Sequence, residues 1–402
     1  KTPANFKRHF TTEIKKRVPR SNFENSLQNA AEEFIIHTNN HTEVIAGYPW
    51  FGRWGRDTFV ALPGLTLTKG DKKTFHAVVK TMLGELKNGL FPNLGHGADA
   101  SFNSVDTSLW FFWALNQYVL ITGKTAGLWA SYGKAMESIL NNYRKGTLHQ
   151  IRMHDNGLIW AGETGKAVTW MDAIVEGKPV TARTGFAVEI NALWYEAIRF
   201  ALQLAEEAED QRFVNRWKKW PEIIRKSFAV MFWDEEKGYL ADYVTYEHKD
   251  FTIRPNMVIA ASLPFSPLNL DMKIAVLRKA KSELLTPRGL RSLSPRFVEY
   301  KGKYRGNQEE RDLAYHQGTA WPWLLGPFAE AWLSIYGEKG KPFIRDLYEG
   351  FEAVITEAGV GTISEIYDGD PPHEAGGAIS QAWSVAELLR IKWMLDGKEQ
   401  TK

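Results

Sequence analysis

The sequence contains no cysteine, which excludes a disulfide framework, a thiolate metal site and a cysteine nucleophile. It also has no excess of one charge, because 50 basic and 47 acidic side chains are mixed along the chain and leave a formal net charge of +3. No basic stripe is present. We therefore expect neither nucleic acid nor an anionic membrane as a partner.

Long apolar runs are missing as well. No run reaches the roughly eighteen apolar residues that suggest a membrane-spanning helix, and no signal peptide is visible after Lys1. We expect a cytoplasmic protein, with the periplasm as the alternative. The chain also lacks an initiator Met, and we expect a fragment of a longer protein.

Aromatic residues, in contrast, are abundant. The 16 Trp, 22 Phe and 14 Tyr make up 13% of the chain, and many of them stand beside Gly, Pro, Asp or His rather than in apolar runs. A pyranose ring stacks its apolar face on an indole, while its hydroxyls need donors and acceptors at the edge. This composition therefore indicates either a sugar site or a large core filled with Trp.

The 402 residues suffice for a large core. Residues 1–21, rich in Lys and Arg, predict a solvated linker or connecting helix, and residues 22–402 predict one catalytic domain. Apolar residues at helical spacing recur in about twelve segments, which are 23–38, 57–68, 71–89, 105–122, 125–143, 184–208, 211–230, 254–263, 271–284, 316–336, 341–357 and 380–395. Strand patterns are few and short, at 158–161, 238–246 and 297–304.

This pattern predicts an all-α fold. The loops that carry Trp, Asp and Gly fall between alternate helices, which is typical of paired helices. Six helix pairs closed into a ring, an (α/α)6 toroid, would place these loops at one mouth and the inner helices around a pocket. An open helical solenoid is the alternative, but no fixed short repeat supports it.

The polar and aromatic residues of interest begin with residues 169–172, which contain Trp170 and Asp172 and are followed by Arg183 and Glu189. Asp172 lies between an aromatic polar segment and a long apolar-periodic run, so its carboxyl can face a cleft. It can also be a helix cap, a position that Asp favours.

Two further clusters precede helical segments. In residues 48–58, Trp50 and Trp54 are candidates for stacking on a sugar, and Arg56 and Asp57 for holding its hydroxyls. Helix capping by Asp57 is equally compatible with this pattern. In residues 103–110, the side chains of Asn103 and Asp106 lie about one helical turn apart, where they either cap the helix or grip adjacent hydroxyls.

The remaining two clusters lie in the C-terminal third. Residues 315–323 combine His316, Gln317 and Trp321 with further aromatics, which favours a pocket over a structural His. Residues 361–370 contain Glu365, the natural second carboxylate. Three other acids compete for its role, Asp368, Asp370 and Glu374, and the last helix contributes Gln381 and Trp383.

Two carboxyls set among Trp and Arg are what glycoside hydrolysis requires, because one protonates the leaving oxygen and the other activates water or attacks carbon. A metal site is not predicted. His37 and His41 have helical ligand spacing with Glu33 one turn earlier, but Asn39 and Asn40 argue against a helix there. No cofactor is expected either.

Taken together, these segments resemble the amylo-alpha-1,6-glucosidase domain of glycogen debranching enzymes. The resemblance spans nearly the whole chain in order, and its motifs are Gly55-Arg56-Asp57-Thr58, Asn103-Ser104-Val105-Asp106, Thr169-Trp170-Met171-Asp172, Arg254-Pro255-Asn256, Tyr315-His316-Gln317-Gly318 and Gln381-Ala382-Trp383-Ser384. It implies an (α/α)6 toroid and an inverting exo-hydrolase that removes α-1,6-linked glucose stubs from glycogen-like polymers.

The resemblance also implies roles. Asp172 is similar in position to the general acid of the family and Glu365 to its general base, while Arg183 and Glu189 support the pocket. The substrate-binding set expected from all segments is Trp50, Trp54, Arg56, Asp57, Asn103, Asp106, Trp170, Arg183, Glu189, His316, Gln317, Trp321, Gln381 and Trp383. Microbial members often carry an N-terminal β-rich domain, which the missing start of this chain would have held.

Several other functions fit the same residues. A glucoamylase-like or trehalase-like inverting glucosidase would use the same carboxyls on another linkage. A sugar epimerase on the same toroid would use histidines for proton transfer, and a noncatalytic glycan-binding module would leave the polymer intact. The paired carboxylates favour hydrolysis of a branched α-glucan or oligosaccharide.

Overall fold

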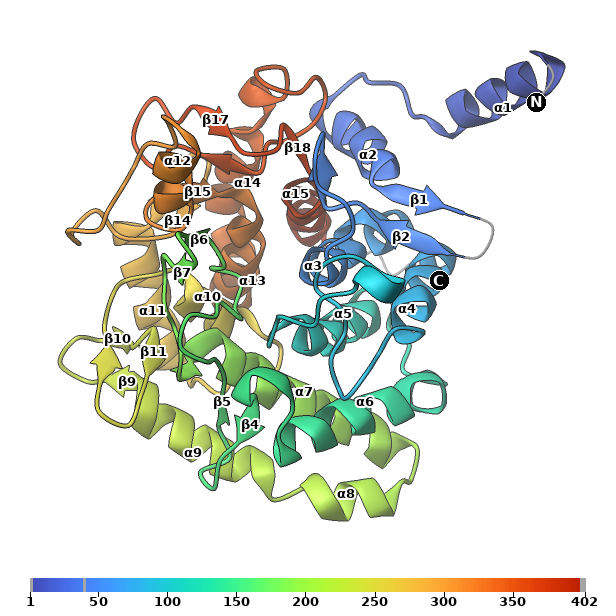
Figure 1. The fold of residues 1–402 in the computed structure, drawn as a ribbon. Coiled ribbons are helices and arrows are strands. Elements are labelled where there is room, and N and C mark those ends of the chain that lie inside the picture. Colours follow the sequence, from blue (N-terminus) through green and yellow to red (C-terminus); the bar gives the residue numbers. More distant parts are fainter. Residues whose placement is uncertain (1–2, 39–40, 398–402) are drawn as a thin grey trace.

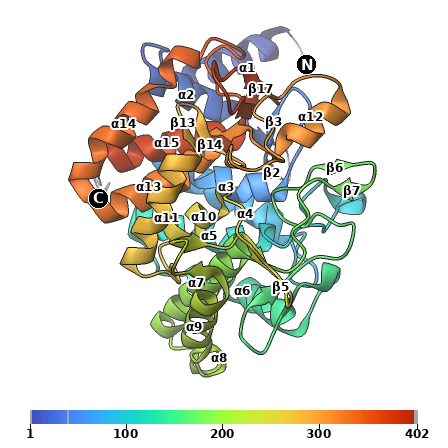
Figure 2. The same cartoon turned by 90° about the vertical axis from the view of Figure 1, so that its left-hand side faces the viewer.

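A computed structural model describes residues 3–38 and 41–397. Figures 1 and 2 show a body built mainly of helices, with short strands in the connections. These strands are two or three residues long. The prediction of a mainly helical chain is confirmed. Among the residues described, no helix is long and apolar enough to cross a membrane.

Six of the described helices form the inside of the body. Each packs against the next along the chain, and the last returns to the first. They are α3 (Gly55–Thr66), α5 (Thr107–Thr122), α7 (Val188–Glu207), α10 (Asn256–Ser262), α13 (Leu325–Tyr336) and α15 (Ala382–Asp396). Every residue of α3 is buried. α3 therefore has no exposed face, as expected for a helix covered on all sides.

The outer helices pack against this inner set. α2 contacts α15 and α3, α4 contacts α3, and α6, α8 and α9 contact α7. α11 contacts α10 and α13, while α14 contacts α15. Their bounds are α2 (Phe23–Glu33), α4 (Lys72–Leu83), α6 (Leu128–Lys145), α8 (Gln211–Trp217), α9 (Trp220–Phe232), α11 (Leu270–Glu283) and α14 (Lys341–Glu349).

Two helices in the part of the chain that the structure describes lie outside this arrangement. α1 (Pro3–Lys16) projects from the edge of the body in Figure 1, and the domain boundary at residue 21 stays a prediction. α12 (Gln308–Tyr315) belongs to the connection between α11 and α13. Asn307 begins it with a capping box, in which the Asn side chain and Glu310 satisfy each other's backbone N–H groups.

Short strands bring distant connections together. An antiparallel sheet joins β13 (Leu285–Thr286), β14 (Gly289–Arg291), β15 (Ala320–Trp321), β16 (Ile366–Tyr367) and β17 (Ala375–Gly376) in that order. Ala320 pairs with Tyr367, which places the connection before α13 beside the one before α15. β18 (Ser380–Gln381) pairs with β3 (Gly47–Tyr48), so the two ends of the inner helix series are tied together.

The other strands form small antiparallel ladders. β8 (Phe186–Ala187) pairs with β11 (Tyr243–Val244), which also pairs with β12 (Lys249–Asp250). Four hairpins complete the set, β1 (Ile35–His37) with β2 (Thr42–Val44), β4 (Arg152–Met153) with β5 (Ile159–Trp160), β6 (Ile174–Val175) with β7 (Lys178–Pro179), and β9 (Trp233–Asp234) with β10 (Tyr239–Leu240).

Several sequence predictions of local structure were wrong. The helices predicted over 71–89 and 341–357 end early, at Leu83 and Glu349. The helix predicted over 23–38 ends at Glu33, and β1 follows it. The helix predicted over 316–336 begins only at Leu325, because Gly318 has a φ of 146° and β15 follows it. No strand spans 297–304, where the N–H of Tyr300 bonds back to the carbonyl of Phe297 in a turn.

Candidate active site

The polar connections meet where the inner helices begin. They line a pocket that encloses about 420 Å³, counting the part open to solvent. The pocket is small, and it combines an aromatic lining with a few convergent polar groups, as ligand sites do. The lining residues are Phe51, Trp54, Arg56, Asp57, Trp170, Asp172, Tyr315, His316, Trp321, Glu365, Gln381 and Trp383.

Asp172 faces this pocket from the connection before α7, and 28% of its side chain is exposed. Burial raises the pKa of its carboxyl, while Arg56, which donates from Nη1 to Oδ2 at 3.1 Å, opposes that rise. Arg56 is itself buried and donates from Nε to both oxygens of Asp106, at 2.9 and 2.8 Å. Because Asp106 neutralises much of the guanidinium charge, Arg56 holds Asp172 in place and still leaves its pKa raised.

Glu365 enters the same pocket just before β16. Its Oε1 accepts a hydrogen bond from the hydroxyl of Tyr315, and its Oε2 accepts one from the backbone N–H of Ala378 at 2.9 Å. Burial raises the pKa of Glu365 to about 7, although these two hydrogen bonds lower it. Both oxygens are therefore held in fixed directions, and the carboxyl titrates near neutral pH.

The backbone beside Glu365 requires glycine. Gly377 has a φ of 67°, in the left-handed region that other residues rarely adopt. A Cβ at this position would lie 2.2 Å from Oε2 of Glu365. The close approach of this turn brings the N–H of Ala378 to the carboxylate.

A third carboxyl lines the pocket. Asp57, in the first turn of α3, is buried and accepts a hydrogen bond from Nε2 of Gln381 at 3.2 Å. Burial raises its pKa to about 8, and the nearby carboxyls of Glu365 and Asp172 add to the rise. Asp57 is therefore mostly protonated at neutral pH and can donate a hydrogen bond as well as accept one.

The aromatic wall of the pocket contains one histidine among the lining residues. His316 stacks on Trp321 with ring centroids 5.3 Å apart and planes 8° apart, and Trp170 meets it edge-on. Burial lowers the pKa of His316 well below 6.5, so the ring is neutral. Within the described residues, His316 Nδ1, Gln381 Oε1 and Trp383 Nε1 are buried without a hydrogen-bond partner. Such atoms are suited to bind the hydroxyls of a ligand.

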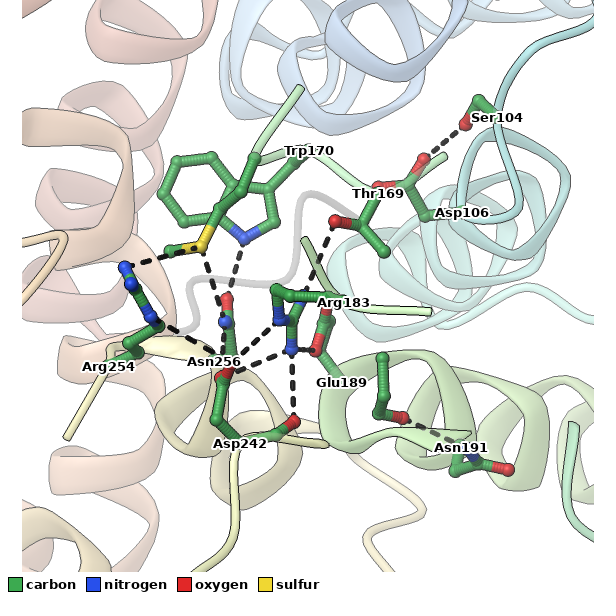
Figure 3. A network of polar contacts seen from close by, with 12 residues as sticks. Ser104, Asp106, Thr169, Trp170, Arg183, Glu189, Asn191, Asp242, Arg254 and Asn256 are labelled. Carbon is green, nitrogen blue, oxygen red and sulfur yellow. Dashed lines mark hydrogen bonds and ion pairs between the residues drawn. The ribbon is translucent and has the colours of Figure 1, made fainter. Parts of the chain in front are cut away.

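A buried polar network lies behind the loop that carries Trp170 and Asp172 (Figure 3). Arg183 donates to both oxygens of Glu189, at 2.5 and 2.6 Å, and to both carboxylate oxygens of Asp242, at 2.7 and 3.1 Å. Asn256 donates to Asp242 at 2.7 Å and accepts from the indole N–H of Trp170 at 2.6 Å. A chain of hydrogen bonds thus runs from the start of α7 and α10 to the loop before Asp172.

Arg254 joins the network to the opposite wall. It donates to the carbonyl of His316 at 2.9 Å and to the side chain of Gln317 at 2.8 Å. Its Nη1 also approaches the sulfur of Met171 at 3.9 Å. The two pocket segments 169–172 and 315–321 are therefore positioned by one set of buried contacts.

The structure brings ten of the predicted site residues into the pocket and places six elsewhere. The ten are Trp54, Arg56, Asp57, Trp170, Asp172, His316, Trp321, Glu365, Gln381 and Trp383. Asp106, Arg183, Glu189 and Gln317 lie behind it as partners of other residues. Asn103 does not line it, and Trp50 is 62% exposed, with its ring against that of Phe51.

Comparison with known proteins shows the family of this chain. A sequence model of the amylo-alpha-1,6-glucosidase family matches residues 28–390. The chain belongs to this family. This family consists of enzymes that act on glycosides.

The individual relatives have low sequence identity to this chain. The glycogen debranching enzyme of Saccharomyces cerevisiae is 25% identical over 467 aligned residues, which cover 89% of this chain and 30% of the yeast enzyme. A periplasmic trehalase of Salmonella schwarzengrund is 25% identical over 127 residues, which cover 31% of this chain and 22% of the trehalase. The chain thus spans less than a third of the length of either relative.

One similar solved structure is a GH63 mannosylglycerate hydrolase from Thermus thermophilus in complex with Tris and D-glycerate. It has a TM-score of 0.62 at 12% identity and covers 93% of this chain and 100% of its own. An uncharacterized conserved protein from the same organism has a TM-score of 0.63, also at 12% identity, and covers 91% of this chain and 99% of its own. These likenesses concern the fold.

Four residues of the site were missed by the sequence reasoning. Phe51 and Tyr315 line the pocket, and both stand inside segments that the sequence singled out. Asn256 belongs to a motif of the family resemblance, Arg254-Pro255-Asn256, to which no role was given. Asp242 had no sequence signal, because an isolated Asp in a strand-like segment is ordinary and its partners lie far away along the chain.

Proposed function

We propose that this enzyme is an inverting exo-glucosidase that releases single glucose units from α-1,6-linked branch stubs of glycogen-like glucans. Asp172 is its general acid and Glu365 its general base. The observation that carries the proposal is that these two carboxyls, from distant segments, line one small pocket together. Membership in the amylo-alpha-1,6-glucosidase family supports the choice of linkage.

The proposed reaction uses the carboxyls on opposite sides of the sugar. Asp172 gives its proton to the glycosidic oxygen as the bond from C1 to that oxygen breaks. Glu365 takes a proton from a water whose oxygen forms the new bond to C1 on the opposite face. Because that water must fit between base and sugar, we expect the two carboxyl groups to lie about 6.5–9.5 Å apart.

Other pocket residues would hold the glucose. We assign Asp57, His316 and Gln381 to its hydroxyls, because all three line the pocket and both His316 and Gln381 have a buried polar atom without a hydrogen-bond partner. Trp321 and Trp383 would provide the apolar wall. Trp50, exposed beside Phe51, would contact the acceptor part of the glucan outside the pocket.

We also infer that the fold is an (α/α)6 toroid. Its support is the packing order of the six inner helices, in which α15 returns to α3, with outer helices against them. In such a ring the connections before the inner helices gather at one mouth. All twelve lining residues come from those connections or the first turns that follow them.

A panel of three substrates tests the linkage. Glucose release would be measured from a glucosyl-branched cyclodextrin, from maltooligosaccharides and from trehalose at equal molar concentrations. We expect kcat/KM on the branched cyclodextrin to exceed the other two by at least about tenfold, because a fitted pocket discriminates through differential transition-state contacts. Faster release from the maltooligosaccharides would instead identify a glucoamylase-like enzyme.

The second candidate is a trehalase-like glucosidase. The observation that favours it is the similarity of about a third of the chain to periplasmic trehalases. Preferential release from trehalose in the same panel would establish it. An epimerase is less well supported, because the described pocket lining contains a single histidine.

The pH dependence of the reaction tests the assignment of the base. Only unprotonated Glu365 can accept a proton from water, and its pKa is about 7. We therefore expect kcat/KM to fall about tenfold for each pH unit below that value. Replacing Tyr315 with Phe removes a hydrogen bond that lowers the pKa of Glu365, so this acid limb is expected to move up by about one pH unit.

The matched control is Tyr300→Phe. Tyr300 also donates a hydrogen bond to a carboxylate, that of Asp370 at 2.8 Å, but lies outside the pocket lining. The Tyr300→Phe variant should show the same acid limb in its pH profile of kcat/KM as the parent enzyme. An unmoved limb in Tyr315→Phe, measured as the pH profile of kcat/KM, would refute the assignment of Glu365 as the titrating base.

A further inference from the structure

A second aromatic site lies on the same end of the inner helices as the pocket. Trp160 of β5 and Tyr246, which follows β11, stack with centroids 5.4 Å apart and planes 14° apart. Both belong to connections that lead into inner helices, α7 and α10 respectively. This site shares no lining residue with the pocket that contains Asp172 and Glu365.

Tyr246 is unusual because it is 71% exposed and still held in a fixed orientation. One ring face lies against Trp160, and Phe186 meets it edge-on with centroids 5.9 Å apart. Its hydroxyl forms a hydrogen bond with Nδ1 of His154 at 2.8 Å. An exposed ring that is already ordered loses little further entropy when a ligand stacks on it.

The turn that presents Tyr246 is ordered by its own hydrogen bonds. The N–H groups of Glu247 and His248 both donate to the hydroxyl of Thr245, at 3.2 and 3.0 Å. The N–H of Thr245 in turn donates to the carbonyl of His248 at 2.8 Å. Tyr246 therefore projects from a closed turn rather than from a loose loop.

Polar groups surround the ring pair. A hollow beside it is lined by Thr147, Gln150, Arg152 and His154 together with both rings. Burial and the charge of Arg152 lower the pKa of His154, which keeps its ring neutral at pH 7. Gln150 and its neighbour His149 both have φ values near 55°, at 55° and 56°, in a region that such residues rarely adopt. Strained backbone of this kind concentrates at functional sites.

We propose that Trp160 and Tyr246 form a second binding site for an α-glucan chain, separate from the catalytic pocket. The outer face of Tyr246 takes the apolar face of a glucose unit, and the surrounding amide, hydroxyl and imidazole groups take its hydroxyls. The choice of an α-glucan as the ligand of this second site rests on the proposed function. A branched polymer held at this site presents its other chain ends at a high local concentration to the pocket.

The test compares Tyr246→Ala with the parent enzyme in two measurements. Affinity for glycogen is measured by retardation in native gels over a range of polymer concentrations. Hydrolysis of the glucosyl-branched cyclodextrin reports on the pocket alone. We expect Tyr246→Ala to weaken the affinity for glycogen at least about tenfold and to leave kcat/KM on the cyclodextrin within about twofold.

Two further variants control the result. Tyr246→Phe keeps the ring and should retain most of the affinity. Tyr336→Ala removes another ring that is 39% exposed and packs on a Trp, at the opposite end of α13, and should change neither measurement. Unchanged retardation of Tyr246→Ala would overturn the proposal, as would an equal loss of activity on the cyclodextrin.

The same gels separate this proposal from that for the reaction. If the parent is retarded by glycogen, Tyr246→Ala is not, and the cyclodextrin is not hydrolysed, the binding site stands and the proposed linkage fails. If the cyclodextrin is hydrolysed and Tyr246→Ala is retarded like the parent, the reaction stands and the second site fails.

Discussion

Asp172→Asn is expected to lower kcat on the branched substrate by about 100- to 10,000-fold, the usual contribution of a positioned general acid. The amide keeps the size of the carboxyl and can still accept from Arg56, which donates to Asp172 at 3.1 Å. The variant should therefore fold and bind substrate as the parent does. The measurement is kcat and KM on the glucosyl-branched cyclodextrin, with the melting temperature recorded in parallel.

The leaving group separates the roles of the two carboxyls. Fluoride departs with little help from an acid, so Asp172→Asn should retain most of its activity on α-glucosyl fluoride. Glu365→Gln should lose activity on both substrates, because each needs water to be activated. Asp155→Asn, at an exposed acid before β5, is the control and should match the parent. Full activity of Asp172→Asn on the cyclodextrin would end its assignment as the acid.

Arg183→Met is expected to cost about 3–5 kcal/mol in the free energy of unfolding, because it leaves the buried carboxylate of Glu189 without its cation and that of Asp242 with only Arg254, whose Nε lies 4.0 Å away. Arg183 alone donates to both Glu189 and Asp242, at distances from 2.5 to 3.1 Å. Burial already raises the pKa of Glu189, and Arg183 opposes that rise. The measurement is denaturant unfolding of parent and variant.

The loss of unfolding free energy in Arg183→Met should also depend on pH. Without Arg183 the carboxyl of Glu189 titrates at higher pH than in the parent and can bind a proton as the pH falls. Protonation removes the uncompensated charge, so the deficit relative to the parent should be larger at pH 8 than at pH 5.5. Activity should fall as well, because the network holds Trp170 and the loop before Asp172 through Asn256.

Arg212→Met provides the matched comparison. Arg212 is 65% exposed and pairs with Glu137 at 2.8 Å, so removing it should cost no more than about 1 kcal/mol. If Arg183→Met costs no more than Arg212→Met, the buried network does not stabilise the site.

The two carboxyls proposed to act in catalysis, and most of the pocket lining, could be predicted from the sequence. Short polar and aromatic segments next to predicted helices contain Trp170, Asp172, His316 and Glu365. In a helical protein, such connecting segments commonly contribute the ligand-binding residues. The helical fold class could be predicted from the apolar residues at helical spacing, because this spacing can be recognised without knowing the tertiary contacts.

The rest depends on contacts between distant segments. Nothing beside Asp242 in the sequence indicates that it binds Arg183, and the role of Tyr315 depends on Glu365 lying next to it. The helix predicted from residue 316 was wrong because apolar spacing continues through Gly318 and β15, where the sheet with β14 and β16 takes the backbone hydrogen bonds. The spacing of apolar residues indicates which residues are buried, but it does not distinguish burial in a helix from burial in a short strand.

The anomer of the first glucose released tests the central claim most directly. Proton NMR would follow the glucosyl-branched cyclodextrin during the first minutes of hydrolysis, before mutarotation mixes the anomers. Our account, with Asp172 as acid and Glu365 activating water, predicts β-glucose. Initial release of α-glucose would contradict it, because retention requires a carboxylate that attacks the sugar itself.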